Sequence, residues 1–379
     1  MNKYLYILGL VGAALFSACS NSDDLSIVES PAIDEAKESA LIYEAGQNSE
    51  VPITLGISQS RGVTRTPLES VDDIDGLAVF CLATGSQKAN IPIINNWFND
   101  KDGELGGLLV RMKNVPATVS STGEVSYTGH YYYPMTNWMK YNFYAYYPKQ
   151  DDSNVTFTSS GNQVSVKFTA LDGIHDVIWG RAYPDIPDSE HATGHDPYCA
   201  DYFRFNTTSK GPQFKFEHKL VQFKFSVKAT DAAVTAGAKV TDMYISNAIK
   251  QLTLIVANKN DTIRNGKVTP ATTKIGDLKI KKFVEDVDRF DGTDGKALTL
   301  TTSEQVVGYL MLPAPPNLSA PGSAGFKYHI SGTVKFSDES EQDISIYMNP
   351  KTQIPGSDPA EYGFESGKIY NILITIDKN

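Results

Sequence analysis

The chain has 379 residues, of which 41% are hydrophobic and 11% aromatic, and its formal net charge is −10. A chain of this length holds about two domains of ordinary size, and the hydrophobic share is enough to build their cores. The negative charge leaves no basic stripe to neutralise phosphates, so nucleic acid is excluded as an expected partner.

The first residues have the pattern of a lipoprotein signal peptide over residues 1–18. An uncharged run from Tyr4 to Phe16 follows Lys3, and it is shorter than the roughly 20 residues that a membrane-spanning helix needs. The small residues Ser17 and Ala18 then precede Cys19, which is predicted to become the first mature residue and to carry lipid. Each buried CH₂ of an acyl chain contributes about 0.8 kcal/mol to membrane binding. The alternative is an ordinary secreted protein with an unrelated cysteine at this position.

Residues 19–50 are polar and acidic, which predicts a tether between the lipid and the folded body. Acidic residues directly after Cys19 resemble a signal that sends lipoproteins of some Gram-negative anaerobes to the cell surface. The two remaining cysteines, Cys81 and Cys199, either pair with each other or stay buried as thiols. The chain is therefore not a disulfide-stapled scaffold.

From residue 51 the pattern changes to period two, which predicts a half-buried strand over residues 51–58. The apolar positions of this strand are Val51, Ile53, Leu55 and Ile57. Burial of these four side chains would contribute up to about 6–12 kcal/mol, a large share of the roughly 5–15 kcal/mol by which a domain is stable. A polar loop with Arg61 and Arg65 follows, where a protease could reach the chain.

Many further short strands with frequent turn residues are expected, and long amphipathic helices are missing. The expected strands include residues 77–82, 142–147, 163–168, 221–228, 251–257, 306–312, 328–336 and 342–347. This pattern predicts an all-β protein of antiparallel sandwiches. A stretch rich in Pro, Asp, His and Gly places the boundary between an N-terminal domain, residues 51–205, and a C-terminal domain, residues 206–379.

The last predicted strand is residues 368–376, and its apolar positions share one face. They are Tyr370, Ile372, Ile374 and Ile376. Because side chains alternate by two, a slip of one residue would bury Asn371 and Thr375 instead, so the register is specified.

Three stretches and the N-terminal plan resemble the fimbrillin family, the subunits of type V pili. The stretches are residues 133–148, which end in Tyr-Ala-Tyr-Tyr-Pro, residues 216–225 around His218, and the closing residues 364–376. The resemblance implies two transthyretin-like β-sandwich domains in tandem and a building block of surface filaments. It also implies that an Arg-specific protease removes the first strand, and that a neighbouring copy or related pilus subunit donates the replacement.

This resemblance and the strand pattern together give the leading hypothesis. Residues 51–57 would leave an edge of the first sandwich after cleavage at Arg61 or Arg65, and the closing strand of another molecule would refill it by β-augmentation. The first alternative is an uncleaved tip or anchor adhesin of the same fold that binds a host or bacterial glycan or protein. The second is a surface-tethered hydrolase, which the sequence disfavours because no catalytic motif is present.

Several residue clusters are interpreted as structural, and neither a cofactor nor a metal is expected. His191, His195 and Cys199 have zinc-ligand chemistry, but Gly and Pro place them in a loop. The acids at 99–102 and 288–294 lack EF-hand spacing and are expected to be solvated turns. His218 is expected to be a hydrogen-bonded structural residue. The tyrosines of residues 127–144 are expected to pack the sandwich in preference to forming a sugar-stacking platform.

Overall fold

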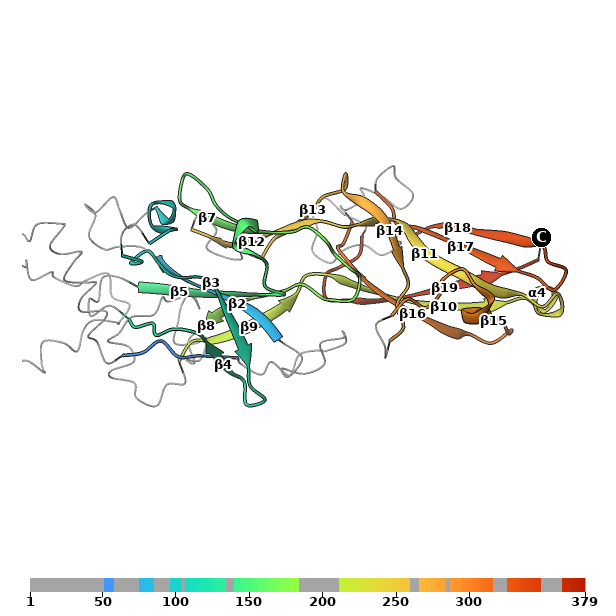
Figure 1. The fold of residues 1–379 in the computed structure, drawn as a ribbon, viewed down its shortest axis with the longest axis horizontal. Helices are drawn as coiled ribbons and strands as arrows, with labels where there is room; N and C mark the ends of the chain where they lie inside the picture. Colours follow the sequence, from blue (N-terminus) through green and yellow to red (C-terminus); the bar gives the residue numbers. More distant parts are fainter. Residues whose placement is uncertain are drawn as a thin grey trace, which may run out of the picture.

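The protein is an all-β chain in a computed structural model, which describes residues 51–57, 75–84, 96–103, 106–133, 140–183, 211–259, 266–283, 287–315, 326–348 and 363–378. Figure 1 shows the described strands in two groups that lie end to end along the long axis. Each group surrounds a hydrophobic core of its own.

The first group contains a seven-stranded sheet that closes on itself in the order β1-β4-β3-β2-β5-β8-β9. Its strands are Leu55–Ile57 (β1), Asp75–Thr84 (β2), Val110–Val119 (β3), Glu124–Tyr127 (β4), Lys140–Tyr147 (β5), Ile178–Tyr183 (β8) and Gln213–His218 (β9). All neighbouring pairs are antiparallel except β1 and β9, which run parallel. Closure leaves this sheet without an open edge as long as β1 is in place.

A four-stranded sheet in the order β13-β12-β7-β6 packs into the same core. Its strands are Val155–Phe157 (β6), Gln163–Phe168 (β7), Leu252–Asn258 (β12) and Val268–Pro270 (β13). Alternating residues of β7 and β12 are buried against the closed sheet, and the ring of Phe168 meets Tyr146 edge-on at 5.9 Å. The β12–β13 hairpin therefore belongs to the first core, although it follows residue 206 in sequence.

The second group is a sandwich of two sheets that share one core. The smaller sheet has the order β16-β10-β19, and the larger has the order β14-β11-β17-β18 with β15 beside β11. The strands are Val221–Ala229 (β10), Lys239–Ile249 (β11), Ile275–Lys279 (β14), Leu298–Thr299 (β15), Gln305–Leu312 (β16), His329–Lys335 (β17), Glu341–Tyr347 (β18) and Ile369–Ile376 (β19).

The helices of the described residues are short and lie in the connections between strands. They are three 3₁₀ turns, Trp97–Asp100 (η3), Asp152–Asn154 (η4) and Asp294–Lys296 (η5), and one α-helical turn, Asp231–Thr235 (α4). Thr230 caps α4, because its hydroxyl accepts the backbone N–H of Ala233.

The chain passes from one core to the other with almost no linker. Between the end of β9 and the start of β10 lie two residues, Lys219 and Leu220. Leu220 is buried in the first core, and Val221, the next residue, is buried in the second. The two cores are therefore joined through consecutive strands.

The all-β fold is confirmed, but the expectation of purely antiparallel sheets is wrong. The sheets are not purely antiparallel, because β1 pairs in parallel with β9 and β19 pairs in parallel with β10. Both parallel partners are far apart in sequence, as parallel strands require, since a tight hairpin can join only antiparallel strands. The boundary between residues 205 and 206 lies outside the described residues and stays a prediction.

Candidate functional site

The predicted first strand closes the seven-stranded sheet. β1 runs antiparallel to β4, with Leu55 opposite Val125, and parallel to β9, with Ile57 opposite Phe214. The space that β1 occupies between these two strands is called the slot here. If β1 were removed, strands β4 and β9 would each present an unpaired row of backbone N–H and C=O groups to the slot.

Residues before β1 continue its pairing along the tyrosine-rich segment that follows β4. The N–H of Ile53 donates to the carbonyl of Tyr131 at 2.9 Å, and the N–H of Tyr133 donates to the carbonyl of Val51 at 3.2 Å. The hydroxyl of Tyr127 donates to the carbonyl of Ile53. Burial raises the pKa of Tyr127, so this hydroxyl stays a donor.

Apolar side chains of this segment fill the first core, as the sequence predicts. Ile53 is 2% exposed and Leu55 is 3% exposed, whereas Val51 and Ile57 are half-buried and pack against the same core. Over the described part of the predicted 51–58, the regular strand covers only Leu55–Ile57, and Pro52 makes an isolated bridge with Tyr132. The two fully buried side chains contribute up to about 3–6 kcal/mol, half of the value expected from four.

Glycines allow the neighbouring chain segments to approach β1 closely. Gly211 has a φ of +76°, and a Cβ placed on it would lie 2.6 Å from the carbonyl oxygen of Thr54. The next residue, Pro212, accepts the N–H of Gly56 at 3.0 Å. On the other side, the N–H of Ile57 donates to the carbonyl of Gly123 at 2.7 Å. The sequence pattern gave no sign of these contacts, because they join segments far apart in the chain.

The predicted closing strand is β19, an edge strand of the second sandwich. Among the described residues it pairs only with β10, over eight positions from Ile369 opposite Gln222 to Ile376 opposite Ala229. Ile374 is 3% exposed and Ile376 is 6% exposed, while the outward-facing Leu373 is 47% exposed. Tyr370 and Ile372 are partly buried and pack against the second core.

Both candidate strands therefore share one arrangement. Each is a short apolar segment that runs parallel to another strand, β1 beside β9 and β19 beside β10. The structure does not bring β1 and β19 together within one molecule, because they belong to different cores.

The remaining predicted processing residues cannot be placed. The lipidation candidate Cys19 and the cleavage candidates Arg61 and Arg65 lie outside the described residues, as do His191, His195 and Cys199. Cys81 lies in β2, is fully buried and forms no disulfide. Burial raises the pKa of its thiol well above the usual value, which disfavours the nucleophilic thiolate.

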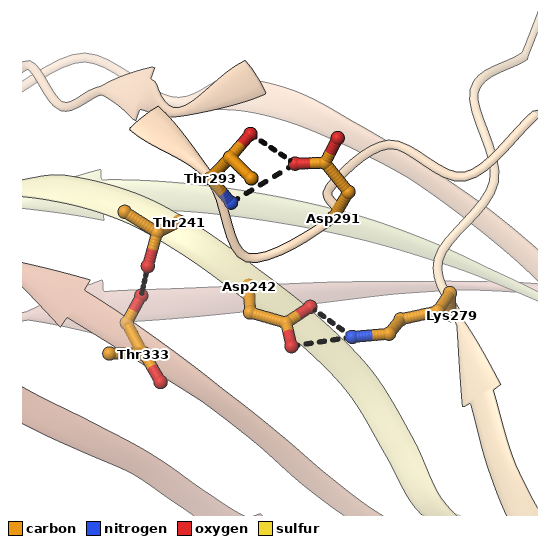
Figure 2. Close-up of polar contacts among 6 residues, drawn as sticks. All are labelled: Thr241, Asp242, Lys279, Asp291, Thr293 and Thr333. Atoms are coloured by element: carbon orange, nitrogen blue, oxygen red, sulfur yellow. Dashed lines mark hydrogen bonds and ion pairs between the residues drawn. The ribbon is translucent and has the colours of Figure 1, made fainter. Parts of the chain in front are cut away.

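The acids of residues 288–294 are paired within the protein. Figure 2 shows that the Asp291 carboxylate accepts both the N–H and the hydroxyl of Thr293, at 3.0 and 2.5 Å. In the same view Asp242 is paired with Lys279. Asp288 lies 2.6 Å from the ammonium of Lys281. In the part of the chain that the structure describes, no group of three or more His, Cys, Asp or Glu is placed to hold a metal ion.

Asp100 departs from the expected solvated turn. It is 1% exposed, and its carboxylate accepts the N–H groups of Gly107, Leu109 and Val110 at 3.1, 2.6 and 3.1 Å. A buried carboxylate is stable only with such partners, so Asp100 fixes the entry into β3.

His218 is hydrogen-bonded, as expected, and its partner is the buried Asp176. The Nδ1 atom of His218 lies 2.5 Å from Oδ2 of Asp176, whose side chain has no exposed area. Burial raises the pKa of Asp176, and the His218 imidazole partly opposes this. The pair stands where β8 begins and β9 ends, beside Gly367 at the start of β19. The sequence gave no sign of Asp176, which is 42 residues away.

The tyrosine cluster mainly packs the first core. Tyr133, Tyr141 and Tyr144 are buried, and Tyr127 and Tyr131 are half-buried against the segment that leads into β1. Of these residues, Tyr127, Tyr131 and Tyr133 form hydrogen bonds with the segment that leads into β1. No helix of the described residues is long and apolar enough to span a membrane.

Comparison with known protein families identifies the family of this chain. A family model described as fimbrillin-like matches residues 64–379, which include every described strand from β2 to β19. No curated protein matches the chain.

Solved structures of similar proteins come from Bacteroides species and from Porphyromonas gingivalis. A proposed cell adhesion protein from Bacteroides uniformis is 15% identical with a TM-score of 0.43, covering 86% of this chain and 94% of that chain. One from Bacteroides ovatus is 14% identical with a TM-score of 0.41, covering 87% and 92%. The tip fimbrial protein Mfa3 from Porphyromonas gingivalis, with a C-terminal truncation, is 9% identical with a TM-score of 0.36, covering 86% and 96%. Because the family model spans most of its length, the chain belongs to the fimbrillin-like family.

Proposed function

We propose that this protein is a structural subunit of a cell-surface pilus that supports adhesion and is assembled by strand exchange between copies or related subunits. The chain is exported as an outer-membrane lipoprotein anchored through Cys19, and an Arg-specific protease cuts the loop at Arg61 or Arg65. The segment with Val51, Ile53, Leu55 and Ile57 then leaves, and the fold is a tandem of transthyretin-like sandwiches. The observation that carries this proposal is that a three-residue strand, β1, closes a seven-stranded sheet.

Loss of β1 exposes both an apolar floor and two rows of backbone groups. Ile53 and Leu55 are almost fully buried, so their removal would lower the free energy of unfolding by up to about 3–6 kcal/mol. A domain is typically stable by only about 5–15 kcal/mol. A replacement strand restores this burial and the hydrogen bonds to β4 and β9. An empty slot is therefore a strong acceptor.

β19 is the segment best suited to be the donor. It already forms a parallel ladder with β10, the geometry that the slot requires beside β9. One register matches the two apolar patterns throughout: Tyr370, Ile372, Ile374 and Ile376 replace Val51, Ile53, Leu55 and Ile57 in that order.

Donation has a cost within the donor molecule. Ile374 and Ile376 are buried in the second core, and they lie opposite Val227 and Ala229 of β10. Release of β19 alone would therefore be unfavourable, and it is offset only as the strand enters the slot of the next subunit. This coupling keeps isolated molecules monomeric until an empty slot is offered.

N-terminal sequencing of surface-located protein, combined with a gel of unheated and heated samples, tests the proposal. A start at Gly62 or Thr66 together with a ladder of multimers that collapses on heating is expected. Protein that begins only at Cys19 and migrates as a monomer would reject cleavage and assembly. That result would instead favour the uncleaved tip or anchor adhesin, for which a glycan array is the next measurement.

A further inference from the structure

The outward face of β1 is covered at one position by a side chain of β9. Gly56 is buried although its neighbours Leu55 and Ile57 are the residues that face the core. A Cβ placed on Gly56 would lie 2.6 Å from Nε2 and 2.7 Å from Oε1 of Gln213. Real Cβ atoms essentially never show separations under 3.0 Å, so a side chain here requires the Gln213 amide, the end of a flexible side chain, to shift.

Gln213 is itself held over this position. Its Nε2 donates to the carbonyl of Gly211 at 3.2 Å, and its backbone lies directly opposite Gly56 in the parallel pair of β1 and β9. Gly211 in turn approaches Thr54 closely, so the amide, Gly211 and the backbone of β1 form one packed layer. A side chain at residue 56 would break the hydrogen bond as well as the packing.

The backbone at Gly56 sets no restriction of its own. Its φ lies outside the left-handed region that favours glycine, and Gly56 sits in a regular strand. An extended position of this kind ordinarily prefers β-branched residues such as Thr. The nearest obstacle to a side chain at residue 56 is therefore the Gln213 amide.

We propose that Gln213 is a specificity-determining residue of the slot, which selects strands with glycine at the position it covers. This inference rests on the proposed function for its biological meaning. In the register that matches all four apolar positions, β19 brings Thr375 to the place of Gly56. The slot therefore binds β1 of its own chain more favourably than β19 of another molecule. It accepts that β19 only when the Gln213 side chain changes its conformation.

This preference acts as a safeguard against early exchange. While β1 is attached, it is both tethered and the better fit, so a neighbouring β19 does not displace it. After cleavage the tether is lost, and the moderate cost of moving one flexible side chain no longer prevents entry of β19. Gln213 therefore disfavours strand exchange before cleavage and allows it after cleavage.

A double-mutant cycle on the full chain tests the contact directly. The proteins compared are the unchanged chain, Gly56→Thr, Gln213→Gly and the double variant, and the readout is the thermal unfolding midpoint. Gly56→Thr should lower the midpoint by about 2 °C or more in the unchanged background, because the added side chain overpacks the site. In the Gln213→Gly background the same change should leave the midpoint equal or raise it, because Thr suits an extended strand.

Gly276 of β14 provides the matched control. It also lies in a strand without a left-handed φ, but the nearest atom to its Cβ position is Cγ of Lys250 at an ordinary 3.8 Å. Gly276→Thr should therefore not lower the midpoint in either background. Equal losses from Gly56→Thr with and without Gln213 would overturn the proposal.

The rate of ladder formation by cleaved protein gives the second readout. Gln213→Gly should raise the initial rate about threefold or more, because Thr375 then enters the slot without displacing an amide. An unchanged rate would overturn the selective role even if the cycle shows coupling. If no ladder forms with any protein, strand exchange fails while the cycle still decides the contact between Gly56 and Gln213.

Discussion

Asp100 shows at the scale of one residue how a buried charge can fix a loop. Its carboxylate receives three backbone N–H groups at the entry to β3. Asp100→Asn keeps the shape but loses the charge and replaces one acceptor by a donor, so we expect a loss of about 2–3 kcal/mol in unfolding free energy, measured by urea denaturation. Asp102→Asn, at an exposed carboxylate, should leave the midpoint unchanged. Equal effects of the two variants would show that the three bonds contribute little.

The pair of His218 and Asp176 should make stability depend on pH. Burial raises the pKa of Asp176, so its charged form is disfavoured in the folded state and protonation on acidification relieves this. His218→Ala removes the main group that opposes the rise and leaves a buried carboxylate without its imidazole partner. We expect the free energy of unfolding to fall by about 3 kcal/mol at pH ~8 and by less at pH ~4, where protonation neutralises the carboxyl group.

Urea unfolding of His218→Ala at the two pH values measures this difference. His218→Gln is the control, because its amide can donate the same hydrogen bond and should recover part of the loss. A loss that does not change with pH would mean that the charge of Asp176 is not the cause.

At the scale of single elements, Gly211 is expected to hold β1 in place. Gly211→Ala combines strain at a φ of +76° with a contact of 2.6 Å to the carbonyl oxygen of Thr54. Gly292→Ala provides the control, because Gly292 has a similar φ of +83° and no atom within 4 Å of its Cβ position. Gly211→Ala should therefore be more destabilising than Gly292→Ala, by about 1–3 kcal/mol.

Hydrogen exchange at the amides of Ile53, Gly56 and Ile57 measures whether β1 itself is loosened. Faster exchange at these amides in Gly211→Ala, with the amides of β10 unchanged, is the expected result. Uniform acceleration across both cores would indicate general destabilisation and would contradict a local role.

Most strands could be predicted from sequence, because alternation of apolar side chains is a local signal. Residues 163–168 coincide with β7, and the predicted 306–312 and 342–347 differ from β16 and β18 by one residue at the start. Strand partners could not be predicted in this way, because pairing joins residues far apart. The parallel placement of β1 beside β9 and the cover of Gly56 by Gln213 depend on such long-range contacts.

At the scale of the whole molecule, the two cores should unfold together. The first core takes Leu252, Leu254 and Val256 from β12, which lies beyond the start of the second sandwich in sequence, and the indole of Trp179 donates to the carbonyl of Val256 at 2.9 Å. Leu254→Ala should cost about 2–5 kcal/mol and shift one common transition. Tryptophan fluorescence follows the first core, and hydrogen exchange at Phe225 and Val227 follows the second. Two separate transitions would contradict this coupling.

The sequence indicated two cores and their approximate extent. It did not indicate that a strand from within the second half of the chain packs into the first core. The alternating pattern of residues 251–257 shows that a strand is present without showing which core it enters. That choice is made by the ladder with β7, where Leu252 lies opposite Phe168. The candidate strands β1 and β19 were found because each is apolar on one face and lies near an end of the folded region.

The short step from β9 to β10 has a mechanical consequence. A pull applied along the molecule, from the slot of the first core to the second core, runs through the continuous backbone that joins β9 to β10. In an assembled fibre, the donated β19 and the β9 of the receiving subunit would form a parallel ladder that is loaded in shear and resists as a group, whereas a hairpin opened from its tip yields one pair at a time. A fibre built from such units would be expected to stay intact under fluid drag while remaining simple to lengthen at its end.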